Sequence, residues 1–96
     1  MLQFLIIAED GKDQDALERR MQARPAHLEG AKKLKEENHF LIGGATLDSE
    51  RNMNGSIMIV QFETEAELNE WLHQDPYMTS NVWKKIEVKP FRVAEV

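Results

Sequence analysis

Residues 56–72, SIMIVQFETEAELNEWL, contain a strand, a helix start and a helix in direct succession. The centre of the first part, residues 57–60, is an unbroken apolar run rich in isoleucine and valine, which is typical of a buried strand. Thr64 followed by Glu67 matches a capping box, in which each residue satisfies a free backbone N–H of the other at a helix start. Three apolar residues then recur at helical spacing: Leu68, Trp71 and Leu72. The stretch therefore predicts a strand that ends at Phe62 and leads directly into an amphipathic helix.

The segments on either side of this stretch repeat the alternation between strand and helix. Apolar and β-branched residues predict further strands over Leu2–Ala8, Phe40–Ala45 and Val82–Val93. The polar segment 48–54 predicts a hairpin connection, closed by the pair Asn54-Gly55, which accepts positive φ. Asp75 before Pro76 predicts a short helical turn, because aspartate caps free N–H groups and proline suits the first helical position.

Pro25 interrupts the helical pattern between the first two strands. It lacks the N–H group that would continue the helix, and it disfavours helical geometry at the residue before it. The sequence therefore predicts a helix over about residues 14–22, then a kink or restart, and a second helical piece over 25–37. Arg24 and His27 would then lie at the start of a helix.

The predicted order β-α-β-β-α-β is that of a ferredoxin-like α+β fold, an antiparallel sheet with two helices on one face. The other face of such a sheet stays open. We expect its apolar residues to be Leu2, Phe4 and Ile6 or their alternates, with Met58, Val60 and Ile86. An exposed apolar patch of that size usually marks an interface, so we expect a homodimer formed through the open sheet face.

Length and composition exclude several classes of protein. We expect a single domain over residues 1–96, because the chain has only 96 residues. A net charge of −5 with scattered lysines and arginines argues against a nucleic-acid partner, and no apolar run is long enough to cross a membrane. The absence of cysteine excludes disulfides, thiolate catalysis and cysteine-ligated zinc. We expect a cytoplasmic protein.

Histidine is the residue type most suited to acid–base chemistry near neutral pH, and the chain has three of them. No spacing typical of a metal site links His27, His39 and His73, so no metal is expected. His39 lies before a strand and His73 at a helix end, where structural or solvated roles are expected.

His27 is the strongest candidate for a functional group. It follows Arg24 by three residues, so the two side chains share a helix face. A lone histidine on a packed helix is more often a satisfied core residue than a catalyst. The carboxylate of Asp75 would change that interpretation by fixing the imidazole tautomer and raising its basicity, although a plain N-cap is the alternative role for Asp75.

Several short motifs, in this order, resemble those of the YciI-like (YCII-related) family. They are Arg24-Pro25-Ala26-His27-Leu28, Gly43-Gly44, Gly55-Ser56 leading into Gln61-Phe62-Glu63, Asp75-Pro76-Tyr77 and Val88-Lys89-Pro90-Phe91. The resemblance implies a dimeric α+β barrel made of ferredoxin-like halves. It also implies a His-Asp pair at a cleft, formed by His27 and Asp75, with Arg24, Ser56 and Tyr77 as nearby binding residues.

The chain departs from this family pattern at two positions. Asn81 stands where relatives often carry glycine, and asparagine tolerates the left-handed backbone conformation that such a turn requires. Ala45 stands where relatives often have proline, which leaves the shape of the loop after Gly43-Gly44 open.

The resemblance implies three functional alternatives. The first is a cofactor-free enzyme of lyase or isomerase type, because a related member resembles a dehydrochlorinase acting on a chlorinated hydroxyquinol. In such an enzyme, His27 would act as acid or base on a small anionic or aromatic molecule, and Asp75 would orient the imidazole. Arg24 would hold an anion, and Ser56 or Tyr77 would donate a hydrogen bond. The second is a non-catalytic binding or accessory dimer in which the His-Asp pair is structural. The third, a haem- or metal-handling barrel, has no support in the residue spacings.

Overall fold

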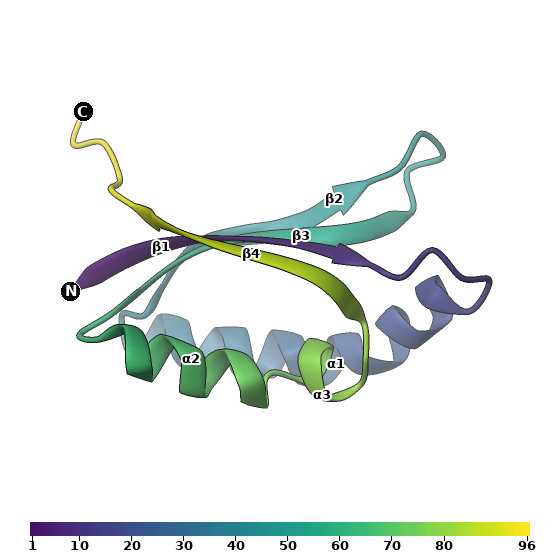
Figure 1. Ribbon diagram of the computed structural model, residues 1–96, viewed down its shortest axis with the longest axis horizontal. Coiled ribbons are helices and arrows are strands. Elements are labelled where there is room, and N and C mark those ends of the chain that lie inside the picture. The colour runs from purple at the N-terminus through teal and green to yellow at the C-terminus, as the bar shows by residue number, and fades with distance from the viewer.

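The computed structural model describes all 96 residues, which form a four-stranded sheet with its helices on one side (Figure 1). The elements in chain order are β1 (Leu2–Asp10), α1 (Ala16–Glu36), β2 (Phe40–Leu47), β3 (Met53–Phe62), α2 (Glu65–Gln74), α3 (Pro76–Thr79) and β4 (Trp83–Phe91). The strand order is β2-β3-β1-β4, and all three pairings are antiparallel. The predicted ferredoxin-like α+β fold is confirmed.

The core lies between the sheet and the helical layer. Phe4 pairs with Val60 and Ile6 with Met58 in the β1–β3 register, and all four are at most 5% exposed. Residues directly opposite one another in an antiparallel pair share a face of the sheet, so these residues form the face that the helices cover. Leu68 and Leu72 of α2 complete this layer from the helical side.

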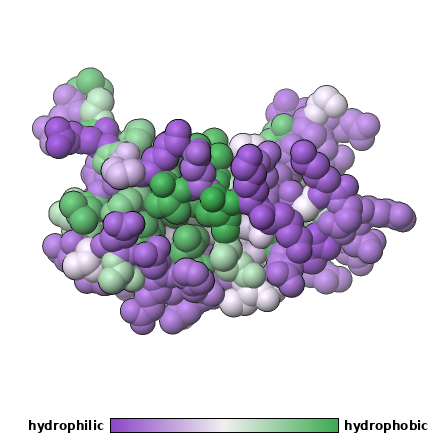
Figure 2. Space-filling view, in the orientation of Figure 1, coloured by the Kyte–Doolittle hydropathy of each residue, from purple (hydrophilic) through white to green (hydrophobic).

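The residues that we expected first on the open face therefore lie on the covered face instead. Phe4, Ile6, Met58 and Val60 lie under the helices, and Ile86 is paired with Ala8 on the same covered side. The alternates form the open face. Its apolar residues are Leu5, Ile7, Ile42, Ile57, Ile59 and Phe91. In Figure 2 hydrophobic side chains gather around the middle of the molecule, near the dip between the C-terminal tail and the β2–β3 hairpin.

The helix α1 continues through Pro25, contrary to the predicted break. Pro25 and Met21, whose carbonyl would have bonded to its missing N–H, are both exposed, so water can satisfy that carbonyl. The opposite face of α1 is buried, and its residues hold the helix together across the proline: Ala16, Arg20, Ala23, His27 and Leu34. Arg24 and His27 consequently lie in the middle of a helix and not at its start.

The turns contain three non-glycine residues with positive φ, namely Asn38, Arg51 and Asn81. Asn81 has φ 58°, as the left-handed turn expected there requires. The β2–β3 turn is shorter than predicted, because β2 extends to Leu47 and β3 begins at Met53. Its positive φ lies at Arg51 and not at the Asn54-Gly55 pair.

Two of the predicted helix caps are confirmed. The Thr64 hydroxyl accepts a hydrogen bond from the backbone N–H of Glu67 at 3.2 Å, at the start of α2. The Asp75 carboxylate accepts one from the backbone N–H of Tyr77 at 2.9 Å, at the start of α3. Tyr77 is thereby placed under the sheet. None of the helices is long and apolar enough to cross a membrane.

Candidate functional site

The structure brings His27 and Asp75 together from segments 48 residues apart. Nδ1 of His27 lies 2.9 Å from Oδ2 and 3.1 Å from Oδ1 of the carboxylate. An ionised carboxylate only accepts hydrogen bonds, so Nδ1 carries the proton and donates it. In the neutral imidazole, Nε2 is then left with a free lone pair, as an acid–base residue requires.

Aromatic rings fix the plane of the His27 imidazole. It stacks on the ring of Tyr77, with centroids 3.9 Å apart and planes 13° apart. Trp83 approaches the imidazole edge-on, at 5.8 Å and 77°. The side chains of His27 and Asp75 are only 10% and 2% exposed. Both the direction and the tilt of the imidazole are therefore set before any ligand binds.

A small pocket of about 80 Å³ lies beside this pair, between α1 and the strands β2 and β3. Its lining includes the five residues Arg20, Arg24, His27, Ser56 and Tyr77. Nε2 of His27 makes no hydrogen bond within the protein. Every fully buried side-chain nitrogen or oxygen has a hydrogen-bond partner except Nε of Arg20, so Nε2 of His27 is not fully buried. Nε2 is therefore accessible, and the pocket is its route to solvent.

Arg24 is the free cation of this pocket. Its side chain is half-buried, and it forms no hydrogen bond or ion pair with any other residue. The guanidinium can thus offer its five N–H donors to a bound anion. The structure places every residue expected at the site (Arg24, His27, Ser56, Asp75 and Tyr77) in or directly beside one pocket.

A second ion pair, which the sequence analysis missed, lies against the same pocket. Nη1 of Arg20 lies 3.0 and 3.1 Å from the two carboxylate oxygens of Asp10, and both side chains are 3% exposed. Nη2 of Arg20 donates to Oγ of Ser56 at 2.9 Å, and Nε1 of Trp83 donates to the same oxygen at 3.2 Å. A signal for Arg20 existed in the sequence, because positions 20, 24 and 27 share one helix face.

Burial changes the titration of two groups at the site. Burial raises the pKa of Asp10, while the Arg20 guanidinium opposes the rise. Burial also raises the pKa of Tyr77, while the positive charges of Arg20 and Arg24 oppose it. The guanidinium of Arg20 lies 4.6 Å from the centre of the Tyr77 ring, so its charge acts on that ring at close range. The phenol of Tyr77 therefore stays protonated at neutral pH and can donate a hydrogen bond.

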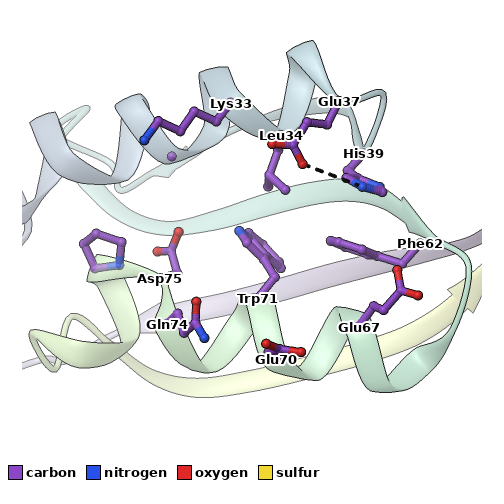
Figure 3. Close-up of a pocket in the computed structure, with 12 residues that line it drawn as sticks. Lys33, Leu34, Glu37, His39, Phe62, Glu67, Glu70, Trp71, Gln74 and Asp75 are labelled. Carbon is purple, nitrogen blue, oxygen red and sulfur yellow. Dashed lines mark ion pairs between the residues drawn. The ribbon is translucent and has the colours of Figure 1, made fainter.

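A larger, shallower groove of about 390 Å³ lies between α1 and α2 (Figure 3). Trp71 projects into it from α2, and Asp75 lies at one end of it. At the other end the imidazole of His39 stacks on Phe62, with ring centroids 4.6 Å apart. Nδ1 of His39 lies 2.8 Å from the Gln61 carbonyl oxygen, in keeping with the structural role expected for His39. Because Asp75 borders the groove and His27 borders the small pocket, the pair lies between the two hollows.

The remaining histidine lies apart from the site. His73 is exposed in the last turn of α2, where Nδ1 lies 2.7 Å from the carbonyl oxygen of Asn69. No group of three or more histidine, cysteine, aspartate or glutamate side chains is gathered where it could hold a metal ion.

Comparisons with known proteins give both a family and a structural neighbour. The model of the YCII-related domain matches residues 2–92. An uncharacterised protein of Haemophilus influenzae is 36% identical, and the protein YciI of Escherichia coli is 33% identical; both alignments cover 93% of this chain and 95% of the relative. The solved structure of 5-chloro-2-hydroxyhydroquinone dehydrochlorinase from Burkholderia phenoliruptrix, in complex with 2,5-dihydroxybenzoquinone, is 25% identical, with a TM-score of 0.84. That superposition covers 96% of this chain and 95% of the dehydrochlorinase.

Proposed function

Because the chain belongs to the YCII-related domain family, we propose that it is a cofactor-free enzyme of lyase or isomerase type that acts on a small anionic or aromatic molecule. The observation that carries this proposal is the state of the His27 imidazole. Nδ1 is held by a buried carboxylate at 2.9 Å, while Nε2 is unpaired and borders a pocket. A buried group with one nitrogen fixed and the other open is suited to proton transfer.

His27 would act as the general base, with Asp75 orienting it. When Nε2 accepts a proton from a ligand C–H group, the C–H bond breaks, an N–H bond forms, and the electron pair remains on the ligand. The Asp75 carboxylate stabilises the resulting imidazolium without taking the proton itself. Return of the proton to a different ligand atom completes an isomerisation. Expulsion of a leaving group such as chloride, with its bonding electrons, completes an elimination.

The other residues of the pocket indicate the class of ligand. Arg24 supplies an unpaired guanidinium, which suits a carboxylate or phenolate oxygen. Ser56 and Tyr77 supply hydroxyl groups, and Tyr77 presents an aromatic face that already stacks on His27. The neighbouring dehydrochlorinase binds 2,5-dihydroxybenzoquinone, a planar ring with several oxygens, which supports a substrate of this kind.

A non-catalytic binding protein is the second candidate, and one observation favours it. His27, Asp75, Tyr77 and Trp83 are all buried, and the rings of His27, Tyr77 and Trp83 contact one another, so the imidazole also helps to pack the core. In this case the pair would stiffen the pocket without transferring a proton. The two candidates differ in what happens when the imidazole is replaced by a polar group of similar size.

The test follows the ring protons of 5-chloro-2-hydroxyhydroquinone by proton NMR in D₂O, with and without the protein. We expect the wild-type chain to accelerate deuterium exchange or loss of the chlorinated compound. His27→Gln should slow the reaction by about 10²–10⁴-fold, because it removes the base. Asp75→Asn should slow it as well while keeping the helix cap, since asparagine caps as well as aspartate.

The matched control is His73→Gln, which changes an exposed histidine remote from the pocket. It should react as the wild type does. If His27→Gln loses thermal stability and the wild type never accelerates proton exchange on this compound or its unchlorinated analogue, the binding protein is the better description.

We also propose that the partner of this chain is a second copy packed on the open sheet face. That face carries six apolar side chains, of which Ile42 is 65% and Ile57 41% exposed. The adjoining part of β4 alternates Lys85, Glu87 and Lys89. Such a row can pair with itself when the two-fold axis lies between a lysine and Glu87, because the lysine of each copy then faces Glu87 of the other.

A further inference from the structure

The groove between α1 and α2 has no role in the proposed reaction, although it has the size of a ligand site. Its volume of about 390 Å³ falls within the range of small-molecule pockets, about 300–1,000 Å³. It shares no lining residue with the small pocket beside His27. It also lies on the helical side of the sheet, so a second copy on the open face would not cover it (Figure 1).

Aromatic rings form one wall of this groove (Figure 3). The imidazole of His39 stacks on Phe62 with planes 13° apart, and the centre of the Phe62 ring lies 5.9 Å from that of Trp71. Phe62 is buried, whereas Trp71 is only partly buried and projects into the groove. The face of an aromatic ring carries partial negative charge, and an indole attracts an organic cation more strongly than other rings do. The wall therefore suits a flat apolar group or a cation.

Gly30 of α1 leaves part of the groove free of a side chain. A Cβ atom at this position would meet no other atom within 4 Å, so a larger side chain would fit there. A glycine inside a helix lowers its stability relative to alanine, and no positive φ at Gly30 requires one. What Gly30 contributes is therefore space in the groove that it lines.

Carboxylates outnumber positive charges around the groove. Four carboxylates line it, and Lys33 is its only lysine or arginine. The carboxylates are those of Glu37, Glu67, Glu70 and Asp75. Glu67 and Glu70 form no ion pair with any residue, and they repel one another because they are three residues apart on α2. The groove would thus repel an anionic ligand, whereas a cation would relieve the repulsion.

We propose that this groove is a second ligand site, which takes a small organic ammonium ion. The apolar part of the ligand lies against Trp71, and its positive charge lies toward Glu67 and Glu70. An ammonium ion fits better than a neutral aromatic compound, because only a cation uses the carboxylates. It fits better than a metal ion, because no group of three or more metal-ligating side chains gathers here. The site goes beyond the proposed function and does not depend on it, since no residue of the small pocket takes part.

The probe for this site is benzyltrimethylammonium, which carries a permanent positive charge next to an aromatic ring. Its anionic counterpart is phenylacetate. Binding is followed by NMR through the indole N–H signal of Trp71, which Trp71→Phe assigns because Trp83 is the only other tryptophan. We expect benzyltrimethylammonium to shift this signal to saturation, and phenylacetate at the same concentration to leave it unchanged. High salt should weaken the binding, because it screens exposed carboxylates.

A double variant tests the contribution of charge. Glu67→Gln combined with Glu70→Gln keeps the shape of the groove but removes its two unpaired carboxylates, and we expect it to weaken binding about tenfold. The matched control combines Glu18→Gln with Glu50→Gln, which changes the net charge by the same amount at exposed positions outside the groove. This control should bind the probe as the wild type does.

A second variant tests the contribution of space. Gly30→Leu places a side chain in the groove without changing any charge, and leucine favours a helix more than glycine does, so the fold is kept. We expect this variant also to weaken binding about tenfold. Thermal unfolding of each variant separates a loss of binding from a loss of fold.

The inference is overturned if benzyltrimethylammonium leaves the Trp71 signal unchanged, or if phenylacetate shifts it equally. It is also overturned if either folded groove variant binds the probe as well as the wild type. Equal weakening in the Glu18 and Glu50 control would mean that the net charge of the chain, and not the groove, attracts the cation. None of these results bears on the proposed function, whose test depends on His27.

Discussion

Asp75 combines two roles that look like alternatives when only the sequence is considered. Its Oδ2 accepts hydrogen bonds both from the backbone N–H of Tyr77 and from Nδ1 of His27, each at 2.9 Å. The N-cap therefore does not compete with the His-Asp pair. It fixes the carboxylate, and the same contact places Tyr77 directly under the imidazole. A cap of this kind makes the orientation of His27 depend on where α3 begins.

Tyr77 gives a prediction at the residue scale, because burial raises its pKa above the ordinary value of 10.0. Between 10.0 and the raised value the folded chain keeps the phenol proton while the unfolded chain loses it. The stability that this group contributes is therefore fully present below pH 10.0 and is lost as the pH rises through the folded pKa. As the pH rises over that range, the free energy of unfolding of Tyr77→Phe should fall less than that of the wild type. Urea unfolding at each pH measures the difference.

The chain itself provides the control for this prediction. Tyr77 is its only tyrosine, so the ultraviolet absorbance of the phenolate reports its titration without interference from another tyrosine. A midpoint at or below 10.0 in the folded protein would contradict the raised pKa.

The predictability of the site differs from residue to residue. His27 and Asp75 could be predicted because their residue types, and the motifs around them, already suggest proton chemistry. Asp10 could not, since in the sequence it stands in a Glu-Asp-Gly cluster that resembles a solvated turn. A charged residue becomes buried only when its partner arrives from another element. Here Arg20 of α1 bonds both to Asp10 at the end of β1 and to Ser56 in β3, and no local sequence pattern predicts these contacts.

At the scale of the element, α1 shows how packing overrides a local preference. A proline inside a helix costs about 3 kcal/mol, which is why the sequence predicts two shorter helices. The cost of Pro25 falls on the exposed side of α1, while Ala23 and His27 on the buried side are held by the sheet and by Asp75. The helix therefore stays continuous, and His27 gains the rigid surroundings of a mid-helix position.

Replacing Pro25 should consequently stabilise the protein. Pro25→Ala restores a backbone donor for the Met21 carbonyl, and we expect a gain of about 1–3 kcal/mol in the free energy of unfolding. A more flexible unfolded chain offsets part of this gain, by about 0.4–1 kcal/mol. Urea unfolding measures the net effect.

The neighbouring Ala26→Gly is the matched control, since Ala26 is also exposed. It should destabilise the protein by about 1 kcal/mol, as glycine does in an ordinary helix interior. If Pro25→Ala proved neutral or destabilising, the proline would be supporting the local backbone beside Arg24, and α1 would not be paying the expected cost for it.

At the scale of the whole molecule, the order of elements could be predicted but the assignment of the two sheet faces could not. Both alternating sets of β1 are apolar: Phe4 and Ile6 on one face, Leu5 and Ile7 on the other. The side-chain period of a strand is two, so a choice of the wrong set reverses every assignment on that strand. Only the helical layer, which lies on one side of the sheet, decides which set is buried.

The apolar character of both faces is also the reason to expect a second copy on the open one. Ile57→Glu would introduce a carboxylate in the middle of that face, where it would lie against apolar side chains of the partner and lose its hydration. We expect the wild type to have twice the mass of one chain at micromolar concentration in light scattering, and Ile57→Glu to have the mass of one. Leu17→Glu, which changes an exposed leucine on α1 instead, should remain a dimer.

The same variant tests how closely the interface and the site are connected. Gly43, Gly44 and Ala45 of β2 border the small pocket beside His27, and they also border a hollow on the open face together with Ile57. A glycine pair leaves this part of the wall without bulky side chains, so a partner seated on the open face would press against the backbone that encloses the ligand. Ile57→Glu should therefore bind 2,5-dihydroxybenzoquinone more weakly than the wild type, although Ile57 does not line the small pocket. Equal affinity in a monomeric Ile57→Glu would mean that each chain encloses its ligand alone. A wild-type chain that is monomeric at micromolar concentration would contradict the proposed interface altogether.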